Sequence, residues 1–127
     1  SYIVKNDIPE MEDLGIPQLV EVYERVLERT GAPPPIVDSR DVLEDPRRVL
    51  GLLCESIGVE FVDAMLGWPP GRRDSDGVWA PHWYDQVEQS TGFRSYRPKS
   101  DEVPEHLAGL LAECQACYDR LYADRLV

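Results

Sequence analysis

A run of three prolines followed by two β-branched residues sets the tightest limit on how this chain can fold. The prolines at positions 33–35 fix φ and bias each preceding residue to extended geometry, so helix is disfavoured there. Ile36 and Val37 continue the run with apolar side chains, which favours one short buried strand. We therefore expect a helix that ends before the prolines and a new one that starts after them.

Helical periodicity dominates the rest of the chain. Asp45 and Pro46 form a strong helix start, because the aspartate can accept a bond from a free N–H and proline has no N–H to leave unpaired. Gly58 is suited to end that helix in a left-handed conformation. Apolar spacing predicts further helices over residues 17–31, 61–66 and 104–121, whereas residues 38–43 predict a turn. The expected fold class is mainly α with one or two short strands.

The composition limits the classes of partner. A chain of 127 residues suits one domain, and 43% apolar residues are typical of a globular protein. The net charge of −11 disfavours general binding to nucleic-acid phosphates or anionic membranes, since both attract clustered Lys and Arg. No apolar run approaches the roughly 20 residues that span a bilayer. We expect neither nucleic-acid nor membrane partners.

Three cysteines favour a reducing compartment. Cys54, Cys114 and Cys117 are odd in number and two lie in a helical pattern, which does not fit a disulfide framework. We therefore expect a cytoplasmic protein. Cys114 and Cys117 lie on an apolar helical face without a second ligand pair, so core thiols explain them better than a zinc or redox site.

Three aspartates near the prolines raise the question of a metal site. Asp38, Asp41 and Asp45 lack the glycine and the closing glutamate of a calcium loop, so turn and cap roles explain them better. No metal site is predicted. The sequence also contains no Gly-x-Ser-x-Gly, no Gly-rich phosphate loop and no His-Glu-x-x-His motif.

Several motifs taken together carry a family resemblance. The residues concerned are Pro33, Pro34, Val37 to Ser39, Asp41 to Leu43, Asp45, Pro46, Leu53 to Trp68, Gly77 to Tyr84, Ser90 to Phe93, Tyr118 and Leu121. Their pattern resembles the C-terminal half of bacterial sulfotransferase-family proteins, which have a P-loop fold. The family's N-terminal nucleotide-binding loop has no counterpart, so we expect residues 1–127 to be a single, partial domain.

The resemblance implies a binding site for the sulfate donor, 3′-phosphoadenosine-5′-phosphosulfate (PAPS). Ser1 looks like the family serine that helps to bind the donor's 3′-phosphate. Arg72 and Arg73 match the two cations of the family motif Arg-Lys-Gly-x-x-Gly-Asp-Trp, while Gly77 matches its second glycine and Trp79 its tryptophan.

Two positions depart from that motif. Asp74 replaces the first glycine and Val78 replaces the aspartate, and a carboxylate beside a phosphate is unfavourable unless it turns away. A pair of arginines suits phosphate, because guanidinium–phosphate bonds are short and bidentate. The alternative is that Arg72 and Arg73 are surface ion-pair partners in an acidic loop.

The aromatic run after the arginines is the second candidate region. Trp79, His82, Trp83 and Tyr84 could wall an acceptor pocket or stack an adenine. His82 is a candidate for a general base, since imidazole titrates near neutrality, but the resemblance assigns it no role. The alternative is that the aromatic side chains fill the domain's own core, with His82 bonded to backbone.

The leading functional hypothesis is a sulfotransferase-like enzyme that moves a sulfuryl group from PAPS to a hydroxyl or amine acceptor. The product would be adenosine 3′,5′-bisphosphate. The missing N-terminal half, or a homo-oligomer partner, would supply the rest of the donor site, so we expect the chain alone to be inactive. Two alternatives stay open, namely a non-enzymatic helical interaction module derived from that fold and a helical domain that binds an apolar ligand at the aromatic loop.

Overall fold

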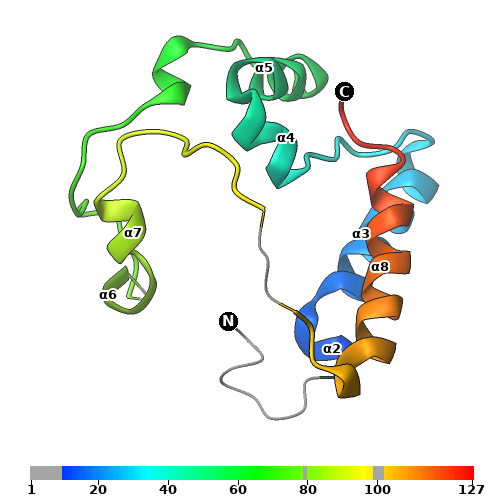
Figure 1. Ribbon diagram of the computed structural model, residues 1–127. Helices are drawn as coiled ribbons and strands as arrows, with labels where there is room; N and C mark the ends of the chain where they lie inside the picture. Colours follow the sequence, from blue (N-terminus) through cyan, green and yellow to red (C-terminus); the bar gives the residue numbers. More distant parts are fainter. Residues whose placement is uncertain (1–9, 79, 99–101) are drawn as a thin grey trace. The chain divides into compact units, whose positions relative to one another are not determined.

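The computed structural model describes residues 10–78, 80–98 and 102–127, and of Trp83 the backbone alone. These residues are mainly helical, with strand pairing limited to two isolated bridges, which confirms the predicted fold class (Figure 1). The elements are α2 (Met11–Leu14), α3 (Ile16–Thr30), α4 (Ser39–Glu44), α5 (Pro46–Ile57), η1 (Asp63–Leu66), α6 (Ala80–Trp83), α7 (Asp85–Glu88), η2 (Glu105–Leu107) and α8 (Ala108–Tyr122).

The described residues fall into two compact units. The first unit lies within Ser1–Asp38 and Pro98–Leu126, and the second comprises Ser39–Arg97 together with Val127. The prediction of a single partial domain over residues 1–127 stays a prediction. Each unit is considered by itself below.

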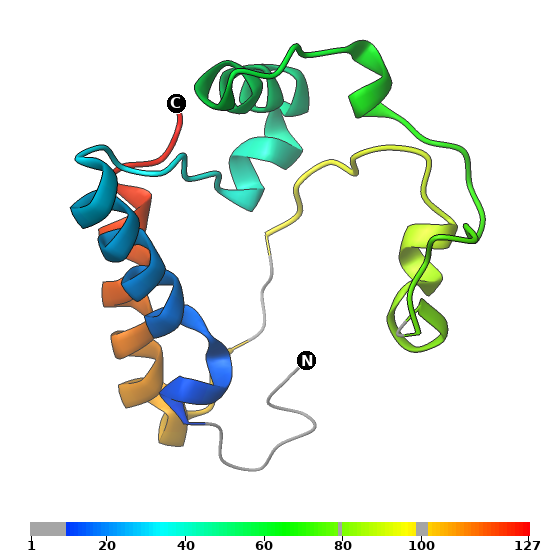
Figure 2. The same ribbon diagram turned by 180° about the vertical axis from the view of Figure 1, so that it is seen from behind.

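In the first unit, α3 and α8 lie side by side, and α2 packs against both (Figures 1 and 2). Pro17 stands in the first turn of α3, and Gly31 ends that helix at φ 72° with its N–H bonded to the Leu27 carbonyl at 2.8 Å. Both features were predicted. Tyr23 on α3 and Leu107, just before α8, are the buried hydrophobic residues in the described part of this unit.

The last helix begins later than predicted. Pro104 is followed by the 3₁₀ turn η2, in which the Leu107 N–H bonds back to the Pro104 carbonyl at 2.9 Å, and regular α-helix starts at Ala108. Such a tighter turn is common at a helix N-terminus, where the first N–H groups have no partner four residues back.

The residues after the prolines are extended but do not form a buried strand. Ile36 makes one parallel bridge to Arg125, with the Leu126 N–H donating to the Ile36 carbonyl at 2.9 Å. Ile36 and Val37 are only half-buried. Pairing stops at one bridge, because Pro34, whose backbone nitrogen faces the same edge as that of Ile36, has no N–H and the C-terminal segment beside it is short.

In the second unit, α5 follows the prediction closely. The Asp45 carboxylate accepts a hydrogen bond from the Arg48 N–H at 3.1 Å, Pro46 occupies the first turn, and Gly58 ends the helix at φ 71°. Val49 is completely buried and Cys54 nearly so. Both of these residues lie on α5, and Ala80 of the same unit is buried as well.

The segment before α5 differs from the prediction. Residues 39–44 form the short helix α4, which packs against α5, instead of a turn. The Arg40 Nε lies 2.8 Å from Glu44 Oε1, an i, i+4 pair of the kind that stabilises a helix surface. Val42 and Leu43 are half-buried, so packing outweighs the turn preference of the polar residues around them.

Candidate functional site

The loop that carries the predicted phosphate-binding arginines is closed at its base by backbone pairing. Gly67 and Gly92 form an antiparallel bridge, the Trp68 N–H donates to the Thr91 carbonyl at 3.1 Å, and the Gly71 N–H donates to the Glu88 carbonyl at 2.7 Å. The two ends of residues 72–87 are thereby held together. We call residues 72–87 the arginine loop.

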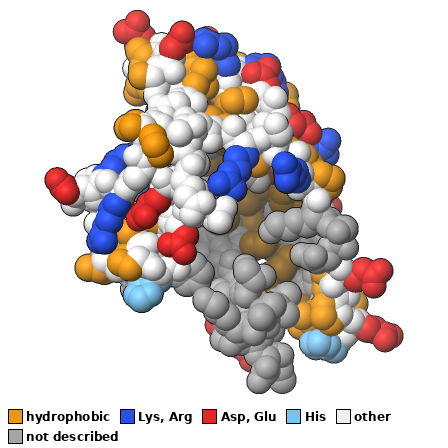
Figure 3. Space-filling model, turned by 60° about the vertical axis from the view of Figure 1, so that its left-hand side comes forward, with side chains coloured by type: hydrophobic (Ala, Val, Ile, Leu, Met, Phe, Trp, Pro, Cys, Tyr) orange, Lys and Arg blue, Asp and Glu red, His pale blue; other side chains and the backbone are white. Residues whose placement is uncertain are grey.

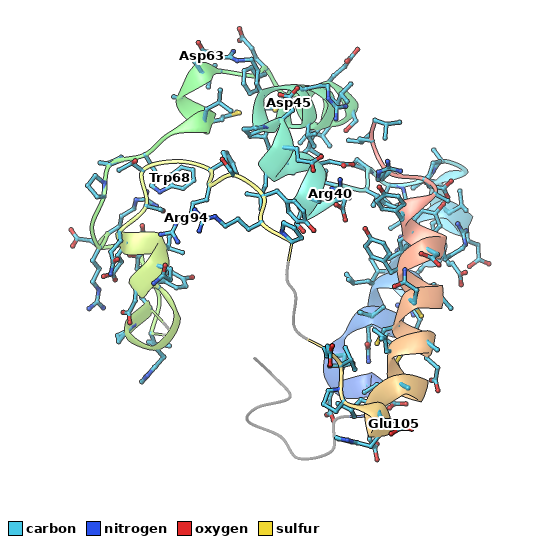
Figure 4. All side chains as sticks on the ribbon, in the orientation of Figure 1. Arg40, Asp45, Asp63, Trp68, Arg94 and Glu105 are labelled. Carbon is cyan, nitrogen blue, oxygen red and sulfur yellow. The ribbon has the colours of Figure 1, made fainter. Side chains whose placement is uncertain are left out.

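Trp68 anchors this base (labelled in Figure 4). Its indole Nε1–H donates to the Ser90 hydroxyl at 2.9 Å, and its ring packs edge-on against Phe93 with ring centroids 5.4 Å apart. The Ser90 hydroxyl in turn donates to the Val87 carbonyl at 2.7 Å. Trp68, Ser90 and Phe93 were predicted only as members of a family pattern, and the pairing of two distant glycines carries no local signal.

Arg72 and Arg73 are exposed near the start of the arginine loop. The Arg73 backbone N–H donates to the Asp76 carboxylate at 2.8 Å, and the Asp76 N–H donates to the Arg73 carbonyl at 3.0 Å, which closes a tight turn. Within the described part of the chain, neither guanidinium group has a carboxylate partner. Both guanidinium groups are therefore available to bind an anion. The Asp76 carboxylate, by contrast, is hydrogen-bonded to the Arg73 backbone.

The rest of the arginine loop is only partly described. The Gly77 carbonyl accepts a bond from the Ala80 N–H at 3.0 Å, and Ala80 is buried at the start of α6. His82 is exposed and makes no hydrogen bond to a described residue, while Tyr84 is 37% exposed. Both side chains border solvent.

Two predicted site residues, Ser1 and Trp79, lie outside the described residues, and so does the side chain of Trp83. The predicted donor site is accordingly represented by Arg72, Arg73 and Gly77, and the predicted acceptor wall by His82 and Tyr84. All five belong to one loop of the second unit.

The first unit contains a cavity that sequence analysis did not anticipate. Its volume is about 400 Å³, and it is lined by Leu19, Val22 and Tyr23 of α3, by residues 34–38, and by Tyr118, Leu121, Tyr122 and Arg125. Most of these side chains are apolar or aromatic. The apolar residues that line this cavity come from three separate segments of the sequence, and only the fold brings these segments together.

Hydrogen bonds fix two walls of this cavity. The Tyr118 hydroxyl donates to the Asp38 carboxylate at 2.9 Å, and burial together with this bond raises the pKa of Tyr118 to about 12. The Tyr23 hydroxyl bonds to the Asp124 carboxylate, which also receives Arg120 at 3.0 Å. Hydrogen bonds from Tyr23 and Arg120 lower the pKa of Asp124.

The described residues offer no cluster of three or more His, Cys, Asp or Glu side chains that could hold a metal ion. All three cysteines are free, with Cys54 buried and the other two half-buried. Cys54 Sγ lies 3.8 Å from Met65 Sδ, and Cys114 Sγ lies 3.5 Å from Met11 Sδ. The thiols thus pack against methionines.

None of the helices in the described ranges has the length and apolar character of a membrane span.

Comparison with known families accounts for the pattern found in the sequence. A family model for the sulfotransferase domain matches residues 1–123, which is almost the whole chain. The chain therefore belongs to the sulfotransferase-domain family. The prediction of a sulfotransferase relationship is confirmed at that level.

Two curated proteins of Arabidopsis thaliana are similar to the chain. Branched-chain-amino-acid aminotransferase-like protein 2 is 35% identical over 109 residues, which cover 86% of this chain and 19% of that protein. Branched-chain-amino-acid aminotransferase-like protein 1 is 39% identical over 87 residues, which cover 68% of this chain and 16% of that protein. The chain spans less than a fifth of either relative. No solved structure matches it significantly.

Proposed function

We propose that this chain is the C-terminal portion of a PAPS-dependent sulfotransferase-like enzyme. The complete enzyme transfers a sulfuryl group from PAPS to a hydroxyl or amine of a small-molecule acceptor and releases adenosine 3′,5′-bisphosphate. The observation that carries the proposal is the match to the sulfotransferase domain over residues 1–123, because this family generally uses PAPS.

In this proposal the arginine loop holds the donor's 3′-phosphate. Arg72 and Arg73 supply charge-assisted hydrogen bonds to its oxygens, Gly77 allows close approach of backbone, and Ser1 and Trp79 complete the site. Support comes from the exposure of both arginines and from the absence of a carboxylate partner for either within the described residues. The Asp76 carboxylate accepts a hydrogen bond from the Arg73 backbone N–H, so one acidic side chain of the loop has a hydrogen-bond donor of its own.

The acceptor binds beside the same loop in this proposal, against Trp79, His82, Trp83 and Tyr84. Catalysis rests on positioning and on stabilising the charge that develops on the transferred group. The cradle for the 5′-sulfate comes from an N-terminal nucleotide-binding half or from a partner chain, so the 127-residue chain by itself has no transferase activity.

Calorimetric titration with adenosine 3′,5′-bisphosphate tests the donor site. The nucleotide is titrated into the 127-residue chain alone and into the chain joined to an N-terminal nucleotide-binding half, where tight binding is expected. The double variant Arg72→Ala/Arg73→Ala should weaken that binding at least about a hundredfold, since two charged hydrogen-bond donors are removed.

The matched control is Arg25→Ala/Arg29→Ala, which removes two exposed arginines from α3 and changes the net charge equally. This control should change the nucleotide affinity of the protein by no more than about twofold, because it alters only the general electrostatic attraction. Equal losses in both double variants would reject a specific phosphate site in the arginine loop. Lack of nucleotide binding by the joined protein would reject the proposed function itself.

A non-enzymatic helical interaction module remains the second candidate. It is favoured by the number of large hydrophobic side chains that stay exposed, such as Leu19 and Val22 on α3 at 59% and 58% (hydrophobic side chains are orange in Figure 3). Such a module would show no nucleotide affinity in any context and would associate with another protein or with itself. Sedimentation at rising concentration separates this candidate from the enzyme.

A further inference from the structure

We propose that the acceptor of this enzyme is an anion, held by an oxyanion site that Arg94, Ser95 and Arg97 form beside the arginine loop. The group bound there is a carboxylate or a phosphate of the acceptor, separate from the hydroxyl or amine that receives the sulfuryl group. The role of this ligand as an acceptor rests on the proposed function, whereas the anion site itself is tested without nucleotide.

The site lies in the least acidic part of the chain. Residues 89–100 form the longest stretch without Asp or Glu, although the whole chain holds 24 of these residues, and they include Arg94, Arg97 and Lys99. The net charge of −11 repels anions at long range, so an anion needs a local excess of positive charge in order to bind. This stretch of sequence supplies such an excess.

A cavity opens at the same stretch. Its volume is about 580 Å³, and the described residues that line it are Arg94, Ser95 and Arg97. All three belong to the second unit and are exposed. Two guanidinium groups and a hydroxyl are suitable donors for a carboxylate or a phosphate, since a guanidinium group can bind either in a bidentate manner. The space beside them accommodates the body of a small molecule.

Neither arginine of this cavity is neutralised by the described part of the chain. The Arg94 Nη1 group donates to the Gln86 side-chain oxygen at 2.8 Å, and its Nη2 lies 3.4 Å from the Gln86 carbonyl oxygen (Arg94 is labelled in Figure 4). Both acceptors are uncharged, so they orient the guanidinium group and leave its charge uncompensated. Arg97 has no carboxylate partner among the described residues.

The arginines on the helices of the same unit behave differently. Arg40, Arg47 and Arg48 each have a carboxylate oxygen close to the guanidinium group, at 2.8, 2.6 and 3.7 Å respectively. An exposed arginine in this acidic chain thus commonly finds an intramolecular carboxylate. The uncompensated charges at the cavity are therefore a local property of this site.

The segment that carries the two cavity arginines is held at two points. Before it, the Phe93 ring packs edge-on against Trp68, with ring centroids 5.4 Å apart. Between the two arginines, the Tyr96 ring lies against the Arg40 guanidinium group, whose carbon is 5.3 Å from the ring centroid. A ligand therefore meets donors on a backbone that is already positioned, which lowers the entropy cost of binding.

The bond between Arg94 and Gln86 connects the cavity with the proposed acceptor wall. Gln86 belongs to α7 and follows two residues after Tyr84, which the proposed function places against the acceptor. An acceptor whose anionic group is held by Arg94 and Arg97 can therefore extend along the arginine loop toward that wall. The phosphates of the nucleotide are the competing occupants, and a nucleotide titration distinguishes them from the acceptor.

The first experiment titrates three small probes into the isotope-labelled 127-residue chain, and again into the chain joined to an N-terminal nucleotide-binding half. Para-hydroxybenzoate carries a carboxylate and a hydroxyl, para-hydroxybenzamide replaces the carboxylate with a neutral amide, and inorganic phosphate is the other oxyanion. The Nε–H resonances of Arg94 and Arg97 report binding. The benzoate should bind at least about tenfold more tightly than the benzamide, because its hydrogen bonds to arginine are charge-assisted.

The double variant Arg94→Gln/Arg97→Gln removes both charges and should reduce the preference for the benzoate to less than about twofold. The matched control is Arg25→Gln/Arg29→Gln on α3 of the first unit, which removes two exposed arginines and changes the net charge equally. This control should keep the preference, because it alters only the general electrostatic attraction.

Gln86→Glu tests the uncompensated charge of Arg94 by itself. The variant keeps an oxygen acceptor for Arg94 but makes it a carboxylate, so it should weaken benzoate binding at least about threefold. Gln18→Glu adds the same charge at an exposed position of α3 in the first unit and should change the affinity by less than about twofold.

Three results would overturn the oxyanion site. They are equal affinities for the benzoate and the benzamide, equal losses in the two double variants, and resonance shifts confined to Arg72 and Arg73. Binding of phosphate or benzoate through Arg94 and Arg97 supports the site, and the tighter of the two identifies the anionic group of the acceptor.

Titration of the joined protein with adenosine 3′,5′-bisphosphate tests the acceptor role. Arg94→Gln/Arg97→Gln should change that affinity by less than about twofold, and a loss as large as that of Arg72→Ala/Arg73→Ala would assign Arg94 and Arg97 to the donor instead. If the joined protein binds benzoate through Arg94 and Arg97 but no nucleotide, the proposed function and the acceptor role are both rejected, whereas the anion site stands.

Discussion

Gly92 lies so close to Leu66 that a Cβ atom at position 92 would sit 3.1 Å from the Leu66 carbonyl oxygen. Gly67 across the bridge is nearly as tight, with 3.3 Å to the Thr91 carbonyl oxygen. Because both neighbours are backbone atoms, neither can swing aside. The close approach of the backbone thus favours glycine on both sides at the base of the arginine loop.

Gly92→Ala should therefore destabilise the second unit by about 1–2 kcal/mol, since overpacking forces the backbone to shift. The control is Gly51→Ala in α5, where a Cβ meets nothing within 4 Å. That change should instead stabilise the unit by up to about 1 kcal/mol through helix propensity. Urea denaturation followed by tryptophan fluorescence measures both, and a neutral Gly92→Ala would show that the base of the loop adapts freely.

The helix cap of α5 gives a prediction for stability without a change in packing. Asp45→Ala should cost about 1 kcal/mol, because the Arg48 N–H loses its acceptor. Asp45→Asn keeps a side-chain oxygen at the cap and should cost only a few tenths of that amount. Thermal unfolding of the two variants compares them directly, and equal losses would point to the charge of Asp45 instead of its cap bond.

Tyr118 predicts how the first unit responds to alkaline pH. Burial and the bond to Asp38 raise its pKa from about 10 to about 12, so folding favours the protonated phenol. The protonated phenol therefore stabilises the folded state fully below about pH 10, and this stabilisation is lost as the pH rises toward 12. It should be modest, since Tyr118 is 42% exposed.

Asp38→Asn tests that assignment. The variant should lower the pKa of Tyr118 but leave it above the ordinary value, because burial is the larger cause and remains. Ultraviolet titration of phenolate formation, with Tyr118→Phe to identify the signal, measures the change. An unaltered Tyr118 titration in Asp38→Asn would mean that the negative charge of Asp38 contributes nothing.

The ion pair between Arg47 and Asp63 makes a prediction for acid pH. Arg47 Nη1 lies 2.6 Å from Asp63 Oδ1, and this hydrogen bond lowers the pKa of Asp63. The resulting stabilisation is present above the ordinary aspartate pKa of about 4 and is lost as the pH falls through the lowered value. It should be small, because both side chains are more than half exposed.

Carbon-detected NMR titration of the Asp63 carboxylate measures this directly. Arg47→Gln should return the midpoint to the ordinary range, and so should high salt, which screens exposed charges. Arg48→Gln is the control, since Arg48 pairs with Asp45 instead. An effect of Arg48→Gln on Asp63 as large as that of Arg47→Gln would rule out the specific pair.

The sequence by itself determined the features that act within a few residues. Asp45 with Pro46, Gly31 and Gly58 mark helix ends through local backbone chemistry, and each was found where it was predicted. The family pattern likewise needs no fold, since it is read from residue identity and spacing. Helix α4 was missed because weak local turn preferences yield to packing against a neighbouring helix.

Tertiary structure alone decided which distant residues meet. The pairing of Gly67 with Gly92 and the cavity between α3, residues 34–38 and α8 depend on contacts between residues far apart in the chain, from the 25 positions between the two glycines to the 101 between Tyr23 and Asp124. No local signal exists for such contacts. The extended residues after the prolines show the same limit. Their conformation follows from Pro33, Pro34 and Pro35, but whether they become a strand depends on a neighbour that local sequence cannot supply.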